Sequence, residues 1–133
     1  MSTASEVPFV SMIQVTRDHL RAYAAASGDN NPIHLDDAVA KANGLPGVIA
    51  HGMLTAGLMA ERAQRWANEH ASGKRLSGFH TRFRSMVFPG DEISIGGLAR
   101  PGQSPGGADE VILELKARNQ KGDIVVTGSA IFR

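Results

Sequence analysis

The segment from His51 to His70 constrains the fold most, because it predicts one long helix whose first half is apolar on nearly every side. The apolar side chains of that half are Met53, Leu54, Ala56, Leu58, Met59 and Ala60. A helix that is apolar all round is a buried helix. In the second half the pattern turns amphipathic: three alanines are predicted to face inward (Ala60, Ala63, Ala67) and four charged residues to face water (Glu61, Arg62, Arg65, Glu69). We therefore expect the helix to start at the centre of the protein and to leave it at its C-terminus.

Five strand-like segments surround this helix in the sequence. Four of them follow it, and a short one precedes it; their ranges are Phe9–Val15, Phe79–Val87, Glu92–Leu98, Val111–Arg118 and Ile124–Phe132. The connections are the turns Pro89–Glu92 and Asn119–Asp123 and a longer flexible segment, Arg100–Asp109. Consecutive strands with short connections pair antiparallel, and the apolar helix is the available cover for such a sheet. The order predicts an α+β fold, one domain over residues 1–133, with an antiparallel sheet wrapped around a central helix.

Two shorter helices are predicted before the long one. Thr16 has the character of an N-cap, and Gly28 ends the helix that follows it. Asp36 or Asp37 is expected to cap a second helix that runs through Ala42 and is closed by Gly44.

Composition excludes several classes of function. The 133 residues are 42% hydrophobic and 20% charged, which is typical of a globular protein, and a net charge of +1 gives no electrostatic case for nucleic acid. There is no cysteine, and hence no disulfide framework or thiol nucleophile. We expect a cytoplasmic protein without signal peptide or membrane span, because the longest apolar-leaning run, residues 44–60, is short. A sheet covered by a single helix often uses a second copy to finish it, so a homodimer is expected.

The chemistry-bearing residues lie on either side of the short second helix. Asp29 and His34 flank a turn, where Asp29 can simply form an Asx turn or can pair with the imidazole as acid and base. His51 precedes Gly52 at the start of the long helix, where free N–H groups polarise a carbonyl oxygen and a glycine lets a ligand approach. His51 itself can cap the helix, brace the loop or contact a substrate. A metal site of two histidines and one carboxylate has no supporting motif, so we expect no metal.

Arg82 and Arg84 are predicted to share one face of a strand. Such arginines are most often solvated charges, and the alternative is an anchor for a phosphate group. No glycine-rich nucleotide motif is present in the sequence, so a nucleotide cofactor is not expected.

The stretch YAAASGDNNPIHLDDAVAKANGLPGVIAHGM (Tyr23–Met53) resembles the signature of the MaoC-like family, which includes (R)-specific enoyl-CoA hydratases and (3R)-hydroxyacyl-ACP dehydratases. The later stretch FRSMVFPGDEI (Phe83–Ile93) resembles another segment of that family. The resemblance implies a hot-dog fold and an acyl thioester substrate carried by coenzyme A or acyl carrier protein, with no further cofactor. It matches Asp29 and His34 to the catalytic pair, Asn31 to an asparagine that arranges the site, and Gly52 to the glycine whose N–H polarises the thioester carbonyl.

Four hypotheses about activity follow from these residues. The first is reversible hydration of trans-2-enoyl-CoA to (R)-3-hydroxyacyl-CoA, with Asp29, His34 and Gly52 as catalytic groups. Its substrate would contact Asn31, His51, Arg82 and Arg84. The second is the same chemistry on acyl carrier protein, which is acidic and would favour a basic rim formed by Arg62, Arg65, Lys74 and Arg75. The third is a thioesterase that uses Glu61, and the fourth is a non-catalytic subunit of a larger assembly.

Overall fold

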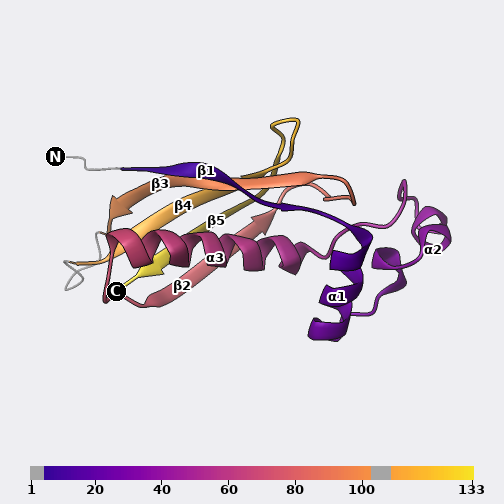
Figure 1. Cartoon of the computed structure of the whole chain (residues 1–133), viewed down its shortest axis with the longest axis horizontal. Helices are drawn as coiled ribbons and strands as arrows, with labels where there is room; N and C mark the ends of the chain where they lie inside the picture. Colours follow the sequence, from indigo (N-terminus) through magenta and orange to yellow (C-terminus); the bar gives the residue numbers. More distant parts are fainter. Residues whose placement is uncertain (1–4, 103–108) are drawn as a thin grey trace.

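A five-stranded antiparallel sheet wraps around one long helix (Figure 1). The computed structural model describes residues 5–102 and 109–133. Its strands and helices in chain order are β1 (Ser5–Gln14), α1 (Arg17–Ser27), the 3-10 turn η1 (Pro32–His34), α2 (Asp37–Ala42), α3 (Gly52–His70), β2 (Leu76–Phe83), β3 (Glu92–Pro101), β4 (Val111–Arg118) and β5 (Ile124–Phe132). The order across the sheet is β1-β3-β4-β5-β2, so β1 and β2 are its edges. The predicted α+β arrangement is confirmed.

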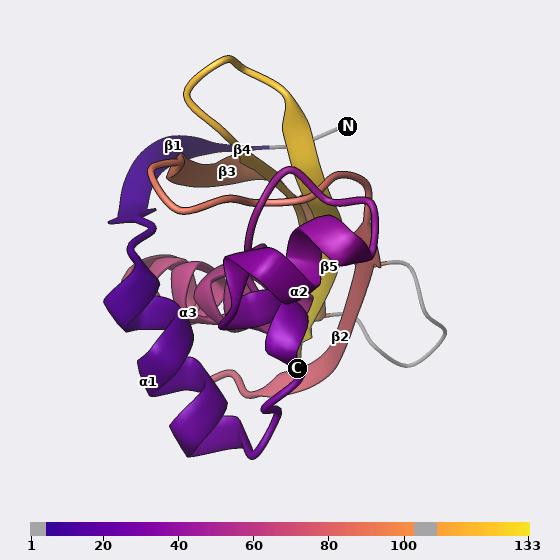
Figure 2. The ribbon, with the colours of Figure 1, turned by 90° about the vertical axis from the view of Figure 1, so that its right-hand side faces the viewer.

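Helix α3 packs its buried face on the concave side of the sheet. Figure 2 shows the sheet curving around α3, with α1 and α2 gathered at the end where α3 begins. Met59, Ala63 and Ala67 of α3 are fully buried with Leu113 of β4 and Phe132 of β5 in one hydrophobic core.

Glycine lets the helix and the sheet approach closely at Gly128 of β5. A Cβ atom added there would lie 2.6 Å from the Met59 sulfur and 2.7 Å from the carbonyl oxygen of His80. A larger residue at this position would therefore force the Met59 side chain and the backbone of β2 at His80 to shift.

The expectation that α3 is buried on every side over its first half is wrong. Met53 is 58% exposed, and Leu54 and Leu58 are only half-buried. The prediction that Arg62 faces water is also wrong, since its side chain is 8% exposed. A bulge in the ladder between β1 and β3 frees the carbonyl of Pro8, and Arg62 donates to that oxygen from Nη2 at 2.6 Å. The guanidinium is therefore held inside by backbone acceptors that the helical pattern does not reveal.

Local capping chemistry sets the ends of the shorter helices as predicted. Thr16 caps α1 in a reciprocal pair with His19, and Gly28 ends the helix in the left-handed conformation, with φ at 79°. The Asp36 carboxylate accepts from two backbone N–H groups at the start of α2, and Gly44, with φ at 82°, follows the end of that helix. Nearby side-chain acceptors decide these boundaries, so they are readable from sequence.

The first strand after α3 differs from its prediction. Phe79–Val87 was expected, but β2 runs from Leu76 to Phe83. The N–H groups of Arg84 and Ser85 both donate to the carbonyl of Val125, so the ladder stops there. The strands β4 and β5 have the predicted bounds, whereas residues 103–108 of the predicted long connection lie outside the described residues. None of the helices in the described part of the chain combines the length and apolar content needed to cross a membrane.

Candidate active site

The turn after α1 fixes the backbone that carries Asp29. The Asp29 N–H donates to Oγ of Ser27 at 3.1 Å, and the Asp29 carboxylate accepts the N–H of Asn31 at 3.2 Å. Asn31 in turn caps η1, because its side-chain oxygen accepts the N–H of Ile33 at 3.2 Å. Asp29 therefore does form the Asx turn that its sequence context suggests, and its carboxylate stays exposed at the same time.

His34, at the end of η1, is buried and its tautomer is determined. Its Nδ1 lies 2.7 Å from the carbonyl oxygen of Ile49. A carbonyl oxygen only accepts, so Nδ1 carries the hydrogen and Nε2 keeps its lone pair. The Ile49 N–H also donates to the carbonyl of Ile33, which aligns the segment before α3 beside η1. The free Nε2 is thus the nitrogen that His34 can offer to a reacting group.

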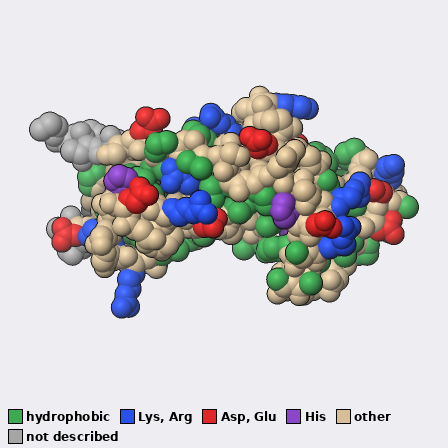
Figure 3. Space-filling model, viewed as in Figure 1, with side chains coloured by type: hydrophobic (Ala, Val, Ile, Leu, Met, Phe, Trp, Pro, Cys, Tyr) green, Lys and Arg blue, Asp and Glu red, His purple; other side chains and the backbone are tan. Residues whose placement is uncertain are grey.

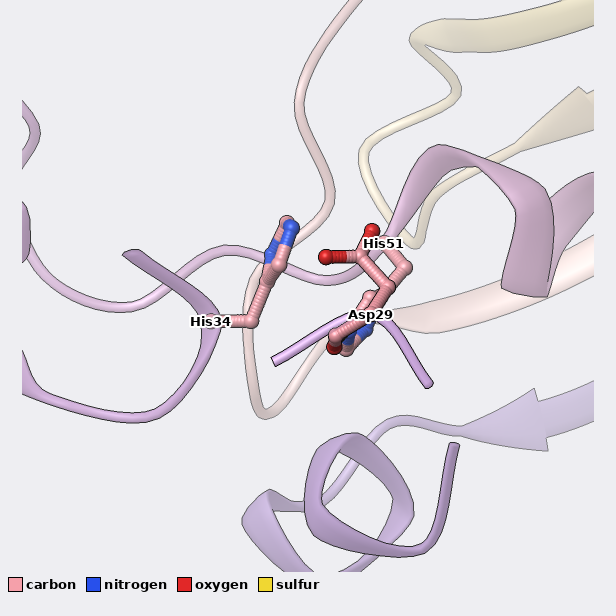
Figure 4. Close-up of side chains that lie close together, drawn as sticks. All are labelled: Asp29, His34 and His51. Atoms are coloured by element: carbon pink, nitrogen blue, oxygen red, sulfur yellow. The ribbon is translucent and has the colours of Figure 1, made fainter. Parts of the chain in front are cut away.

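His51 brings the start of α3 against this turn. Its Nε2 lies 3.0 Å from the backbone carbonyl oxygen of Asp29, and its ring stacks on His34 with centroids 3.8 Å apart. The ring of Tyr23 from α1 also packs against the His51 ring, with centroids 4.8 Å apart. Figure 4 shows Asp29, His34 and His51 lying close together, and potential ligand atoms of the three lie within 4.8 Å of one another. The structure thus unites two segments that are 22 residues apart in sequence.

Gly52 is the first residue of α3, and its N–H lies at an open helix N-terminus. The side chain of His51 makes no capping hydrogen bond there. Among the described residues, the N–H groups of the first turn of α3 therefore have no capping side chain. These N–H groups and the helix dipole favour negative charge. A Cβ atom added at Gly52 would lie 3.0 Å from the ring of Phe83, so any larger residue would crowd that ring beside the N–H.

A pocket of about 740 Å³ opens beside Gly52. Its wall is largely apolar and includes Phe83, Val87 and Phe88, and it also carries Arg84 and Lys121. Asp29 and His34 adjoin this pocket through His51 rather than lining it.

Lys121 is a pocket residue that sequence reasoning missed, because Asn119–Asp123 was read only as a hairpin turn. Gln120 donates to the carboxylate of Asp91 at 2.9 Å, and this bond draws the β4–β5 turn to the pocket. The contact joins residues 29 positions apart, so no local pattern indicates it.

The structure places Arg82 and Arg84 in different pockets. Arg84 lines the pocket beside Gly52, whereas Arg82 lines a separate groove with Phe9 and Lys116. The prediction that both arginines share one strand face is wrong, because β2 ends at Phe83 and the alternation stops with it.

Asp29, His34 and His51 form the donor set of a metal site, but their arrangement does not suit an ion. The two imidazole rings stack with 24° between their planes, so the in-plane lone pairs run side by side instead of converging. One nitrogen of each ring already bonds a carbonyl oxygen, and the remaining Nδ1 of His51 is buried. Imidazole ligands bind a metal along the lone pair at about 2.0–2.1 Å, which this stack does not allow for both rings at once.

Residues 2–98 match the sequence model described as the MaoC like domain. The chain belongs to the MaoC-like family. This MaoC-like chain is 32% identical over 120 residues to fatty acid synthase 2 of Mycosarcoma maydis, a match that covers 84% of the chain but 3% of that protein. Over 49 residues, 37% of the chain, it is 49% identical to 3-hydroxyacyl-thioester dehydratase X of Mycobacterium tuberculosis, and covers 18% of that protein. The chain therefore spans a small part of the length of these curated relatives.

The fold of the MaoC-like chain is that of a solved hydratase. The structure described as R-hydratase PhaJ1 from Pseudomonas aeruginosa superimposes with a TM-score of 0.72 and 28% identity, covering 99% of this chain and 79% of that one. The hot-dog fold that the sequence resemblance implied is confirmed.

Proposed function

We propose that this MaoC-like protein adds water reversibly to trans-2-enoyl thioesters and forms (R)-3-hydroxyacyl thioesters. One observation carries the proposal: an exposed carboxylate, an imidazole with a free Nε2 and an open helix N-terminus meet at one place. These groups supply two acceptors for the hydrogens of a water molecule, which take a proton and return it, and a site for negative charge. Hydration of a double bond conjugated to a thioester needs all three.

The chemical step follows from the two acceptors. A water molecule placed between Asp29 and His34 donates one hydrogen to the carboxylate and the other to Nε2, which aims an oxygen lone pair at C3. As the C3–O bond forms, the π electrons move toward the thioester oxygen, where the Gly52 N–H stabilises the enolate. The pair takes one proton from the water and returns one to C2, so the enzyme regains its starting charge.

Substitution of the pair tests this assignment. We expect Asp29→Asn and His34→Ala each to lower kcat for crotonyl-CoA hydration by roughly 10²–10⁴, the usual contribution of acid–base catalysis. Asn30→Ala is the matched control, because Asn30 lies between Asp29 and Asn31 and its side chain donates a long hydrogen bond to the carbonyl of Gly28, at 3.4 Å. Wild-type rates in both Asp29→Asn and His34→Ala would show that the mechanism is wrong. Chiral analysis of the product tests the (R) stereochemistry.

The first question of substrate specificity is whether the acyl group is carried by coenzyme A or by acyl carrier protein. Similarity to fatty acid synthases favours acyl carrier protein, and similarity to (R)-hydratases favours coenzyme A. The basic rim predicted for the carrier protein is not supported, because Arg62 is buried and Arg65 pairs with Glu61 at 3.1 Å. Lys74 and Arg75 follow the C-terminus of α3, about 28 Å from Gly52 at 1.5 Å per residue.

Arg84 and Lys121 at the pocket are better placed to meet the phosphates of coenzyme A, so we expect the CoA ester to be preferred. Turnover of one acyl group on each carrier decides between them. The thioesterase alternative is not supported, because Glu61, its proposed catalytic residue, forms an exposed ion pair with Arg65. Release of free CoA thiol, measured with a thiol reagent, would reinstate it.

A homodimer is part of the proposal. Strand β2 is an edge of the sheet, and exposed apolar side chains lie on it and next to Gly52, among them Met53 (58% exposed), Phe83 (51%) and Met86 (51%). Figure 3 shows hydrophobic side chains exposed on the face that carries α3. Unpaired edges and apolar patches of this kind favour association. Light scattering during gel filtration tests it: we expect a dimer mass for the wild type and a monomer mass for Phe83→Lys.

The proposed reaction needs no metal and no cofactor besides the thioester carrier, since the site itself supplies the proton transfers and the charge stabilisation. Dialysis against a chelator is expected to leave kcat unchanged. A cytoplasmic location is also proposed, and cell fractionation tests it.

A further inference from the structure

His51 is a buried polar side chain that the proposed mechanism does not use. It is 2% exposed, and its ring contacts two others: the His34 ring stacks on it with centroids 3.8 Å apart, and the tilted Tyr23 ring lies at 4.8 Å. We propose that His51 is a positioning residue that acts through Asp29, holding the carboxylate at a fixed place relative to the N–H of Gly52. This inference rests on the proposed hydratase function.

The hydrogen bond to Asp29 determines the tautomer of His51. The carbonyl oxygen of Asp29 only accepts, so the hydrogen of the neutral ring is on Nε2. Nδ1 then carries a lone pair, is fully buried, and finds no hydrogen-bond partner among the residues that the structure describes. The ring therefore has no polar atom left for a substrate, and its role is to hold the backbone of Asp29 through this hydrogen bond.

The unpaired Nδ1 makes this assignment stronger. A buried acceptor without a donor lowers stability, and an apolar side chain of similar shape would avoid that loss. A purely structural role for the ring, filling space between His34 and Tyr23, needs no nitrogen at all. The single feature that a histidine adds here is the Nε2–H bond to the Asp29 carbonyl, and that bond joins the Asp29 turn to the start of α3.

Connectivity explains why this bond matters for the reaction. His51 is followed directly by Gly52, so one residue joins the carbonyl of Asp29 to the N–H that faces the thioester. The water between Asp29 and His34 must reach C3 while the thioester oxygen lies on that N–H. Misplacement of one partner by about 1 Å is enough to lower such a rate about 10²-fold.

Two substitutions separate the hydrogen bond from the ring. His51→Phe keeps a ring to stack on His34 and removes the donor. His51→Gln removes the ring and keeps an Nε2–H donor at the same number of bonds from the backbone. We expect His51→Phe to lower kcat for enoyl-CoA hydration about 10²-fold with KM within threefold of wild type, and His51→Gln to recover at least tenfold of that loss. A His51→Phe enzyme with kcat within twofold of wild type, or a His51→Gln enzyme no faster than His51→Phe, would overturn the inference.

A double substitution tests that His51 acts through Asp29. If it does, His51→Phe costs nothing further once the carboxylate is gone, so Asp29→Asn/His51→Phe should match Asp29→Asn within threefold. Multiplied losses in the double variant would show that His51 acts independently and would overturn the positioning role.

The tautomer gives a readout that needs no activity. In ¹⁵N NMR spectra of the wild-type protein, Nε2 of His51 should have the shift of a protonated nitrogen and Nδ1 that of a bare one. The opposite tautomer overturns the inference even if the enzyme is a hydratase. An inactive wild-type protein with the expected tautomer would instead count against the proposed function and leave the hydrogen bond established.

Discussion

Replacement of Gly52 by proline removes one hydrogen-bond donor from the site and little else. Proline is favoured at the first position of a helix, where its missing N–H has no intrahelical partner. The preceding residue already has the conformation that proline requires, because His51 has φ at −60° and ψ at 132°. The ring does bring a Cβ atom to about 3.0 Å from Phe83. Gly52→Ala brings the same Cβ atom to Phe83 but keeps the N–H, so it is the matched control for that contact.

The expected magnitude follows from the role of one donor. Loss of one oxyanion donor typically lowers kcat by about 10²–10³, or about 2.7–4 kcal/mol. We expect the lower end for Gly52→Pro relative to Gly52→Ala, because the Met53 N–H of the same helical turn remains. The assay is crotonyl-CoA hydration, followed by loss of enoyl absorbance at saturating substrate, with thermal unfolding to confirm the fold. If Gly52→Pro keeps kcat within twofold of Gly52→Ala, the N–H does not stabilise the transition state. A rise in KM alone would mean that the proline ring only obstructs the substrate.

The remaining predictions concern stability. Arg62→Met should lower the free energy of unfolding by about 2–3 kcal/mol, because it leaves the carbonyls of Pro8 and Ile95 without their charged donor. Arg65→Met removes an exposed ion pair and should lower it by less than about 1 kcal/mol. Urea unfolding measures both, and equal losses would contradict the buried role of Arg62. The backbone N–H of Val48, followed by the guanidinium of Arg17, lowers the pKa of Asp37, so this carboxylate adds stability above the pKa of about 3.9 that it has when unfolded and loses it as pH falls through the folded value. The stability gap between wild type and Asp37→Asn should therefore shrink as the pH falls below about 5 and keep shrinking until the pH passes the lowered folded pKa. Urea unfolding on one buffer series measures it, and a gap that widens on acidification would contradict the assignment.

The sequence by itself determined the order of the helices and strands and the local turns and caps between them. Caps at Thr16 and Asp36, the left-handed end at Gly28 and the Asx turn at Asp29 all depend on groups within four residues of one another. Period-two alternation placed β4, because buried and exposed side chains alternate there from Leu113 to Ala117, whereas β5 buries the consecutive residues Val125 and Val126. Such interactions are local, so they are written into short stretches of sequence.

Only the tertiary structure decided which distant groups meet. The carbonyls that hold Arg62, His34 and His51 belong to segments 54, 15 and 22 residues away, and a carbonyl leaves no mark on the identity of its residue. Any amino acid supplies the same backbone acceptor, and only the packing of α3 against the sheet and the turn brings these acceptors to the side chains. For the same reason, the resemblance to the MaoC-like family grouped Asp29, His34 and Gly52, whereas the fold fixed the tautomers of the two histidines and with them which nitrogen of His34 is left for a reacting group.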